Sequence, residues 1–527
     1  MDQLALLFVL MFAALVMVPV GDRLGLPSPV LMTLLGVLMA LAPFVPNVDI
    51  PPEFILPLLL PPLLYAAVQR TSWRQFATNW RPIFLLAVAL VFVTTAAVAV
   101  VANAIVPGLP IAAAVVLGAL VAPPDPVAVS AVAGSLGLPR RLVSILEGEG
   151  LFNDVTAIVL YNVAISATVT GTYSIGTGTK ELALSFAVGL ATGLVTGWVG
   201  AKMMTVLGDA TLRVGLTLLL PFASYAVSDH FHGSGVLAVL VTALYLAESG
   251  ADADDIEGRL TGAAFWQVID TLITGVAFGL IGLELHSVFG SAQHQVVDML
   301  RWGLTIIAVV IGVRLLWLLP ASWIARRQRR RNPDADVPGS TRETIVMWWS
   351  GMRGVASVAL ALAIPYETDS GEPFPGRNEI VFVAFTVIMV TLVLQGLTLP
   401  WLVRRLGVTA DAATELALEH DLARVAIQAA RARLDELVAA APMPEETVEL
   451  LTRRATDLGL RISPDLADEE RRESFAKRAE RLKVFRQAQA EMMAAARAAV
   501  LAERNRPGAD PEVVDRVLHQ LDVRSPR

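Results

Sequence analysis

The segment VLGALVAPPDPVAVSAVAGSLG, from Val116 to Gly137, places Asp125 among three prolines inside an apolar stretch long enough to cross a membrane. Proline removes a backbone donor and disrupts the preceding turn, so a helix should break here, with a new helix starting at Pro126 after an Asp125 cap. Non-helical backbone at membrane depth is tolerated only against protein or a water-filled cavity. The segment therefore predicts a cavity lined by an acid; the alternative is a simple proline kink.

A second acidic stretch, LVSILEGEGLFNDVTAIVLYNVAISA, runs from Leu142 to Ala167 and carries Glu149 and Asp154. A charge at the bilayer centre costs at least about 2.5 kcal/mol, so such residues usually bind an ion, relay a proton or pair with a buried base. Glu149 and Asn153 share one helix face, and Asp154 lies roughly 140° from Glu149. Asp154 can therefore face a cavity while Glu149 meets a base on a neighbouring helix. The alternatives are the lining of a vestibule or neutralisation by an arginine.

The stretch WWSGMRGVASVALALAIP, from Trp348 to Pro365, predicts a second break, because Gly351 and Gly354 flank Arg353. A guanidinium group stays charged in a protein, so Arg353 needs an anionic partner or water at this depth. Two interrupted helices in distant spans fit the inverted-repeat plan of secondary transporters, with a site near the membrane midplane. The candidate partners of the arginine are Glu149, Asp154 and Asp125.

The whole chain has the composition of an all-α polytopic membrane protein: 55% of its 527 residues are hydrophobic, 17% are charged, and the mean hydropathy is +0.61. It has no cysteine, which excludes disulfides and thiolate metal sites. Residues 1–408 are the predicted membrane domain, and residues 409–527, charged and alanine-rich, are a predicted soluble helical tail. About thirteen spans are expected, the fifth and twelfth broken, beginning near Gln3, Ser28, Glu53, Pro82, Pro110, Leu142, Glu181, Leu212, Gly235, Gly262, Trp302, Thr344 and Ile380.

The lysines and arginines of the loops orient these spans. With the N-terminus outside, nearly all of them fall on the inner side, and the outer side keeps only Lys180, Arg301 and Arg377. This asymmetry predicts a multi-pass protein of the cell membrane with a cytoplasmic tail. Within the spans, Arg314 is expected to brace the core, and Asp270 to be a gate or a hydrogen-bonded strut.

Three motifs, APPDPVAV at Ala122–Val129, LEGEGLFND at Leu146–Asp154 and GMRGVASVALA at Gly351–Ala361, resemble those of the cation/proton antiporter family, in its bacterial sodium/proton exchanger branch. The resemblance covers about residues 3–407, and its specificity comes from the order and span positions of the three motifs together. It implies a thirteen-helix fold with inverted repeats, a homodimer in the lipid bilayer, and exchange of sodium, or of lithium or potassium, for protons by alternating access. No cofactor, enzymatic activity or nucleic-acid partner is expected.

The family's site residues carry over onto matching positions. The resemblance implies that Asp154 carries the cation and the proton, so that sodium would bind at Asp154 and Asp125. It implies that Asn153 marks electroneutral exchangers, and that Glu149 pairs with Arg353. Desolvation disfavours a charged carboxylate, so proton and cation would compete for Asp154 near neutral pH. The implied role is cytoplasmic pH and sodium homeostasis.

Two positions depart from the family pattern. Where the family often has threonine before the aspartate of the fifth span, this chain has Pro124, and where it often has serine after the glutamate of the sixth, this chain has Gly150. Both lost hydroxyls are candidate ligands for a small cation. The Pro124 carbonyl and a water at Gly150 are the expected substitutes.

Other function classes remain open at this point. A potassium/proton antiporter differs only in its ion, and a channel or a cation-coupled symporter would need a different site that the sequence does not exclude. An intramembrane aspartyl protease would use Asp125 and Asp154, but its Gly-x-Gly-Asp motif is absent. A non-transporting sensor that signals through the tail is the last alternative.

Overall fold

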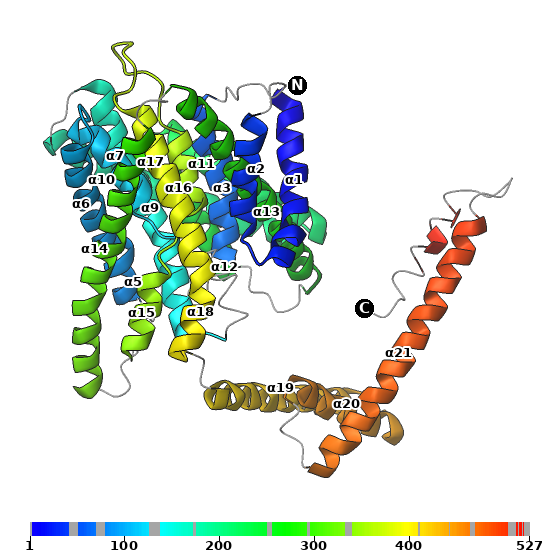
Figure 1. The fold of residues 1–527 in the computed structure, drawn as a ribbon. Helices are drawn as coiled ribbons and strands as arrows, with labels where there is room; N and C mark the ends of the chain where they lie inside the picture. The colour runs from blue at the N-terminus through cyan, green and yellow to red at the C-terminus, as the bar shows by residue number, and fades with distance from the viewer. Residues whose placement is uncertain are drawn as a thin grey trace. The chain divides into compact units, whose positions relative to one another are not determined.

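The computed structural model describes residues 3–41, 51–69, 80–125, 137–171, 175–249, 256–291, 296–331, 340–408, 412–441, 443–463 and 469–503, with short pieces between 513 and 520. The chain divides into two compact units, Met1–Ala410 and Asp411–Arg527. The described residues are helical apart from loops and an isolated bridge between Glu367 and Pro373 (Figure 1). The expected all-α fold is confirmed.

Within the residues that the structure describes, the first unit has eighteen helical segments, two of them π-helical turns. They are α1 (Gln3–Leu24), α2 (Ser28–Ala40), α3 (Pro52–Gln69), α5 (Trp80–Phe84), η1 (Leu85–Ala89), α6 (Leu90–Ile105), α7 (Ile111–Val121), α9 (Arg140–Thr170), α10 (Ile175–Val206), α11 (Ala210–His230), α12 (Gly235–Ser249), α13 (Ile256–Ser291), α14 (Val296–Arg331), α15 (Thr341–Trp349), α16 (Val355–Leu362), α17 (Arg377–Val390), η2 (Thr391–Gln395) and α18 (Gly396–Leu406). The π-helical turn η1 is followed directly by α6, and η2 is followed directly by α18.

Nine helices in the described part of the chain are long and apolar enough to cross a membrane. Three shorter apolar helices, α2, α7 and α12, accompany them, and α15 and α16 form a further, interrupted segment. A chain of this kind is a polytopic membrane protein, because lipid tolerates only backbone that satisfies its own hydrogen bonds. The count of thirteen spans and the inverted repeats stay predictions.

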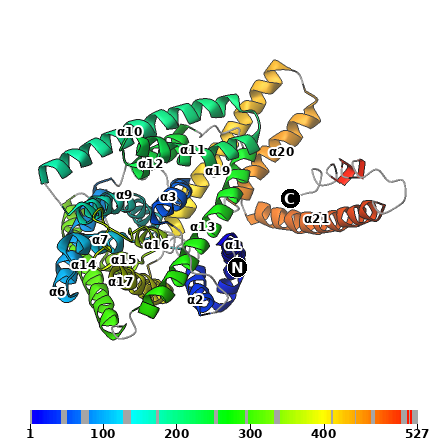
Figure 2. The same ribbon diagram turned by 90° about the horizontal axis from the view of Figure 1, so that it is seen from above.

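The first unit, Met1–Ala410, is the membrane unit, and its described helices form two groups. In one group α6, α7, α9, α14 and α17 pack on one another; in the other α13 packs on α1 and α2, and α12 on α3, α10 and α11. Seen from above, the two groups lie side by side (Figure 2). Helix α16 belongs to the first group and contacts α3 and α13 of the second. The broken segment therefore lies where the two groups meet.

Glycines allow the backbones of α2 and α13 to touch. A Cβ atom at Gly36 would lie 2.3 Å from the carbonyl oxygen of Gly279, and one at Gly282 would lie 2.4 Å from that of Thr33. Membrane helices gain little from hydrophobic association, so close packing through small residues holds them together. These contacts pack α2 and α13 closely against each other.

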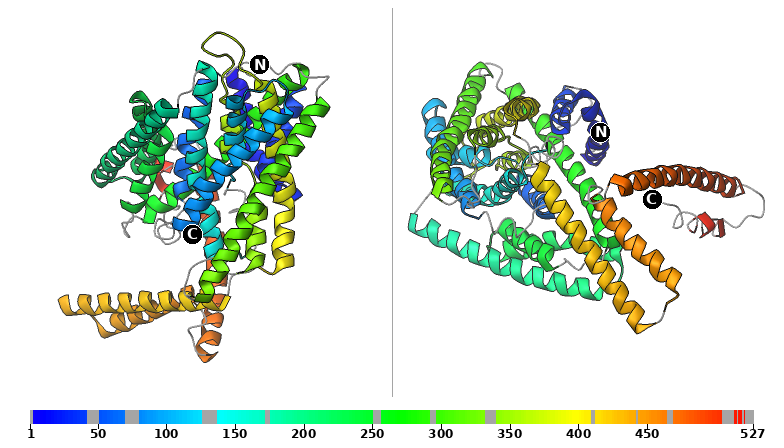
Figure 3. Two further views of the ribbon diagram at one scale, coloured as in Figure 1. Left: turned by 90° about the vertical axis from the view of Figure 1, so that its left-hand side faces the viewer. Right: turned by 90° about the horizontal axis from the view of Figure 1, so that it is seen from below.

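The second unit contains α19 (Ala412–Ala440), α20 (Glu445–Ile462) and α21 (Glu469–Glu503). Helices α19 and α20 lie side by side in both views of Figure 3. Their exposed surfaces carry ion pairs such as Arg433–Glu436 and Arg453–Glu449, within one helix turn. Such pairs contribute little stability, typically about 0.3–0.5 kcal/mol each.

Both predicted breaks begin where the sequence places them. Helix α7 ends at Val121 and is followed by non-helical backbone to Asp125, while the expected new helix start at Pro126 lies outside the described residues. Helix α15 ends at Trp349, and α16 begins at Val355 after five non-helical residues, Ser350–Gly354. The glycines around Arg353 thus interrupt this segment as predicted.

Candidate ion-binding site

The two breaks meet and satisfy each other's backbone groups. The Asp125 N–H donates to the Met352 carbonyl at 2.6 Å, and the Val355 N–H donates to Asp125 Oδ2 at 3.3 Å. A Cβ atom at Gly354 would lie 1.4 Å from that same Oδ2, so only glycine allows this approach. Asp125 is therefore held against the start of α16.

Arg353 ties together the carbonyls that the breaks leave without helical partners. Its Nε donates to the Val121 carbonyl at 2.8 Å and its Nη2 to that of Ala122 at 3.3 Å, while Nη1 donates to the Gly351 carbonyl. The side chain is buried, and the backbone N–H of Arg353 donates to Thr391 Oγ1 at 3.2 Å. Free carbonyls at membrane depth need donors, and the guanidinium supplies several at once.

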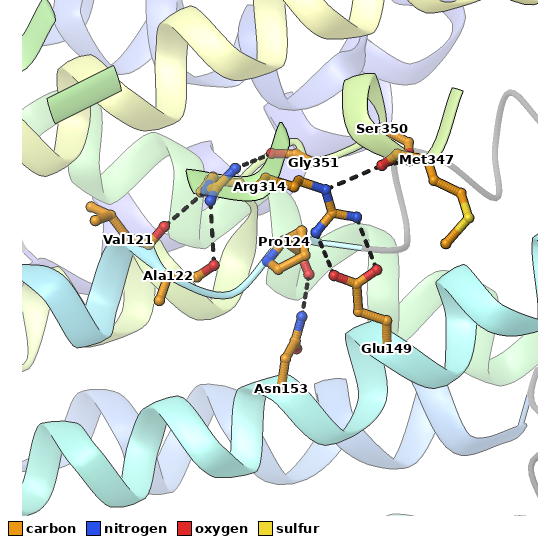
Figure 4. Close-up of polar contacts among 10 residues, drawn as sticks. Val121, Ala122, Pro124, Glu149, Asn153, Arg314, Met347, Ser350 and Gly351 are labelled. Atoms are coloured by element: carbon orange, nitrogen blue, oxygen red, sulfur yellow. Dashed lines mark hydrogen bonds and ion pairs between the residues drawn. The ribbon is translucent and has the colours of Figure 1, made fainter. Parts of the chain in front are cut away.

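The expected pairing of Glu149 with Arg353 is wrong, because Glu149 forms its ion pair with Arg314 of α14. Arg314 Nη2 contacts Glu149 Oε2 at 2.9 Å, and Nη1 contacts Oε1, in a two-pronged geometry (Figure 4). Both residues are buried, at 3% and 1% exposure, and Arg314 Nε also donates to the Met347 carbonyl at 3.1 Å. Arg353 has its donors committed to carbonyls, so the second intramembrane arginine neutralises the glutamate. The sequence predicts that Arg314 braces the core, and in the structure its ion-pair partner is Glu149.

Asn153 faces the first break rather than open space. Its Nδ2 donates to the Pro124 carbonyl at 2.9 Å, and the side chain is fully buried (Figure 4). The contact restrains the non-helical backbone just before Asp125. Neither Asn153 nor Pro124 is among the residues that line the cavity described next. The Pro124 carbonyl thus already accepts a hydrogen bond from the protein.

A cavity of about 50 Å³ lies beside Asp154 and Asp125. Gly150, one turn before Asp154 on α9, also lines it, and the remaining polar lining is Asp270, Thr274 and Ser357. Leucines of α3 close the other side. Two carboxylates at one small space repel when both are ionised, so a proton or a cation between them lowers the energy.

A second cavity, of about 390 Å³, shares Asp125, Asp270 and Thr274 with the first. It extends to Asp22 and Pro27, where α1 gives way to α2, and to Pro400 on α18. The inner cavity is therefore adjacent to a larger space that leads toward one end of the helix bundle. Asp270 stands where the two cavities adjoin.

The predicted division of the α9 helix into two faces agrees with these contacts. Gly150 and Asp154 line the cavity, whereas Glu149 and Asn153 meet Arg314 and Pro124. Ser357 and Thr274 were not singled out from the sequence. Ser357 lies inside the quoted GMRGVASVALA motif, three residues after Gly354, and this place just after a break was the available signal.

Comparison with known proteins adds an independent finding. The family model for the transmembrane sodium/hydrogen exchanger matches residues 9–405. An uncharacterised Na⁺/H⁺ exchanger of Mycobacterium tuberculosis is 34% identical over 443 residues, covering 82% of this chain and 79% of the relative. The Na⁺/H⁺ antiporter NhaH of Halobacillus aidingensis is 28% identical, covering 77% of this chain and 98% of the relative.

Two further matches concern ion range and fold. A sodium, potassium, lithium and rubidium/H⁺ antiporter of Bacillus subtilis is 28% identical over 71% of this chain and 57% of its own length. The solved structure of the sodium proton antiporter MjNhaP1 from Methanocaldococcus jannaschii superimposes with a TM-score of 0.61 at 18% identity, covering 77% of this chain and 98% of that one. At this identity the structural match supports the fold alone.

Proposed function

The chain belongs to the sodium/hydrogen exchanger family, and we propose that Asp154 is the group that carries sodium in one direction and a proton in the other. It is a cation/proton antiporter and not an enzyme. In this role the transported ion is a substrate, and we propose that exchange needs no cofactor. Family membership shows the antiport, and the role of Asp154 is our proposal.

One observation carries the assignment: Asp154 and Asp125 line the same small cavity, next to a larger one. Among the described residues no lysine, arginine or histidine forms an ion pair with Asp154, whereas Glu149 is already neutralised by Arg314. A carboxylate without a fixed base can bind either a proton or a cation. Binding one excludes the other, which is the competition that antiport requires.

The arrangement favours one-for-one exchange. Arg314 and Glu149 cancel each other's charge, and Asn153 is neutral, so Asp154 is the proposed group whose charge changes in the cycle. Asp125 supports it electrostatically from the crossing of the breaks. We propose electroneutral exchange of Na⁺ for H⁺, with Li⁺ or K⁺ as further substrates.

Localisation and assembly follow the same family reasoning. We propose a homodimer in the cell membrane, with the N-terminus outside and the tail in the cytoplasm, serving pH and sodium homeostasis. The distribution of loop arginines supports the orientation.

The test is exchange in proteoliposomes that contain a pH dye and carry an imposed proton gradient. Sodium, lithium, potassium and choline are added in turn. We expect an alkali cation to dissipate the gradient with the native chain and no response with Asp154→Asn. Asp298→Asn, on the exposed surface of α14, is the matched control and should exchange normally. Exchange that persists in Asp154→Asn would remove Asp154 from the proposed role.

A further inference from the structure

Ser357 places a buried hydroxyl group at the cavity that Asp125 and Asp154 line. The residue is 1% exposed, and its Oγ has no hydrogen-bond partner among the described residues. Leaving a buried hydroxyl unsatisfied costs free energy, because the group gives up its hydrogen bonds to water. Native proteins seldom carry that cost, and each such group calls for a specific explanation, such as a water or an ion. Because Ser357 also lines the cavity, its hydroxyl is available to a water or an ion there.

The position of Ser357 is fixed relative to Asp125. Ser357 is the third residue of α16, and the first residue of that helix, Val355, donates its N–H to Asp125 Oδ2. Gly354 packs against the same carboxylate. Ser357 and Asp125 therefore lie at the same helix start and line the same cavity.

The cavity is short of neutral oxygen ligands. Gly150 supplies no side-chain oxygen, and the Pro124 carbonyl accepts from Asn153 and does not line the cavity. The described lining offers three carboxylates, from Asp125, Asp154 and Asp270, and only two hydroxyls, from Thr274 and Ser357. One water needs about 10–15 Å³ of such space, so the inner cavity holds a few waters or one largely dehydrated cation.

We propose that Ser357 Oγ binds the transported cation together with the carboxylates of Asp154 and Asp125, and that this hydroxyl favours small alkali ions over potassium. Carboxylates attract every monovalent cation, whereas discrimination by size depends on the number and spacing of dipolar oxygens around the ion. The inference rests on the proposed function, in which Asp154 carries the ion.

The experiment compares Ser357→Ala and Ser357→Cys with the native chain in proteoliposomes. Cysteine keeps the shape of serine but replaces oxygen by sulfur, a poor ligand for alkali cations. We expect both variants to raise KM for Na⁺ about tenfold, equivalent to about 1.4 kcal/mol, with kcat nearly unchanged. KM for K⁺ should rise less, so the preference for Na⁺ over K⁺ should fall.

Ser228→Ala is the matched control. Ser228 on α11 is also fully buried, its Oγ also lacks a partner among the described residues, and it lines neither cavity described above. Removing this hydroxyl should leave KM for every ion within about twofold of the native value. The control separates the loss of a cation ligand from the general effect of deleting a buried hydroxyl.

A second readout does not need transport. An ion that binds the folded protein raises its melting temperature, so NaCl should stabilise the native chain relative to choline chloride. We expect Ser357→Cys to lose most of this sodium-dependent shift and Ser228→Ala to keep it. Native values of KM and of the shift in both Ser357 variants would overturn the inference. If Asp154→Asn is inactive in the same assays, the proposed function stands independently of that result.

Discussion

At the residue scale, the Glu149–Arg314 pair shows how this protein keeps charges inside a membrane. The two side chains meet through both carboxylate oxygens, and a backbone carbonyl takes the remaining Nε–H of the arginine. A buried ion pair recovers its desolvation cost only with this quality of geometry and further hydrogen bonds. The buried charge of Arg353 is likewise compensated by hydrogen bonds, which it donates to backbone carbonyl oxygens instead of a carboxylate.

Arg314→Ala tests the pair through stability. The substitution leaves Glu149 charged and buried without its partner, and breaking such a pair typically costs about 3–5 kcal/mol. We expect a large fall in the melting temperature of the purified protein. Glu149→Gln combined with Arg314→Met should recover much of it, because neither charge remains. Arg301→Ala, from an exposed pair with Asp298, should change stability by less than about 1 kcal/mol. A double variant as unstable as Arg314→Ala would contradict this role for the pair.

At the element scale, the breaks and the close glycine contacts position the site. The α7 break and the α15–α16 break hold Asp125 between them, while α13, packed closely on α2, carries Asp270 and Thr274 along one wall. Polar backbone at the breaks is satisfied within the protein, which is what permits irregular structure at this depth. The site thus depends on helix ends and one face of α9 from the first group, and on one face of α13 from the second.

Gly282→Ala tests the α2–α13 contact. The added methyl group would lie 2.4 Å from the Thr33 carbonyl oxygen, so the helices must separate. Overpacking of this kind costs about 1–3 kcal/mol, and we expect both a lower melting temperature and slower exchange. Gly215→Ala, on α11, meets open space and should be neutral or slightly stabilising. Equal behaviour of the two variants would show that the glycine contact does not hold the helices together.

At the scale of the whole membrane unit, the ends of the bundle differ. Arg377 at the start of α17 contacts Glu284 of α13 at 3.0 Å and stacks on Tyr366 at 4.2 Å, so the two helix groups are joined there. The larger cavity reaches Pro400, near the far end of α18. The ion pair therefore joins the two helix groups at the end opposite to that cavity, and we expect it to open when this end becomes accessible in the transport cycle.

Glu284→Gln should favour that opening, since it removes one charge of the pair. The chain has no cysteine, so Thr274→Cys in the inner cavity provides a unique label position. We expect a membrane-impermeant thiol reagent, applied from the side of Glu284, to react faster in the Glu284→Gln background. Asp298→Asn serves as the comparison, because its pair with Arg301 lies within α14 alone. Unchanged labelling would mean that the Glu284–Arg377 contact does not control access.

The tail is a separate unit, and its removal gives a further prediction. Truncation after Val408 should preserve basic exchange, because the two cavities and their lining lie entirely within the first unit. Comparing initial rates over a range of pH would reveal any regulatory effect of the tail. Loss of all transport in a monodisperse truncated protein would show instead that the tail is required for the exchange cycle.

Composition and span pattern by themselves determined a helical membrane protein with two interrupted segments, and the three motifs, through their resemblance to the antiporter family, indicated antiport and predicted Asp154 as the leading acid. They could do so because lipid requires self-satisfied backbone and makes each intramembrane charge or proline conspicuous. Only the tertiary structure decided that Arg314 meets Glu149, that Asn153 contacts Pro124 and that Ser357 lines the cavity. Such choices depend on how separate helices are rotated about their axes and which residues distant in sequence come to face each other, and helical periodicity within one segment carries no information about either.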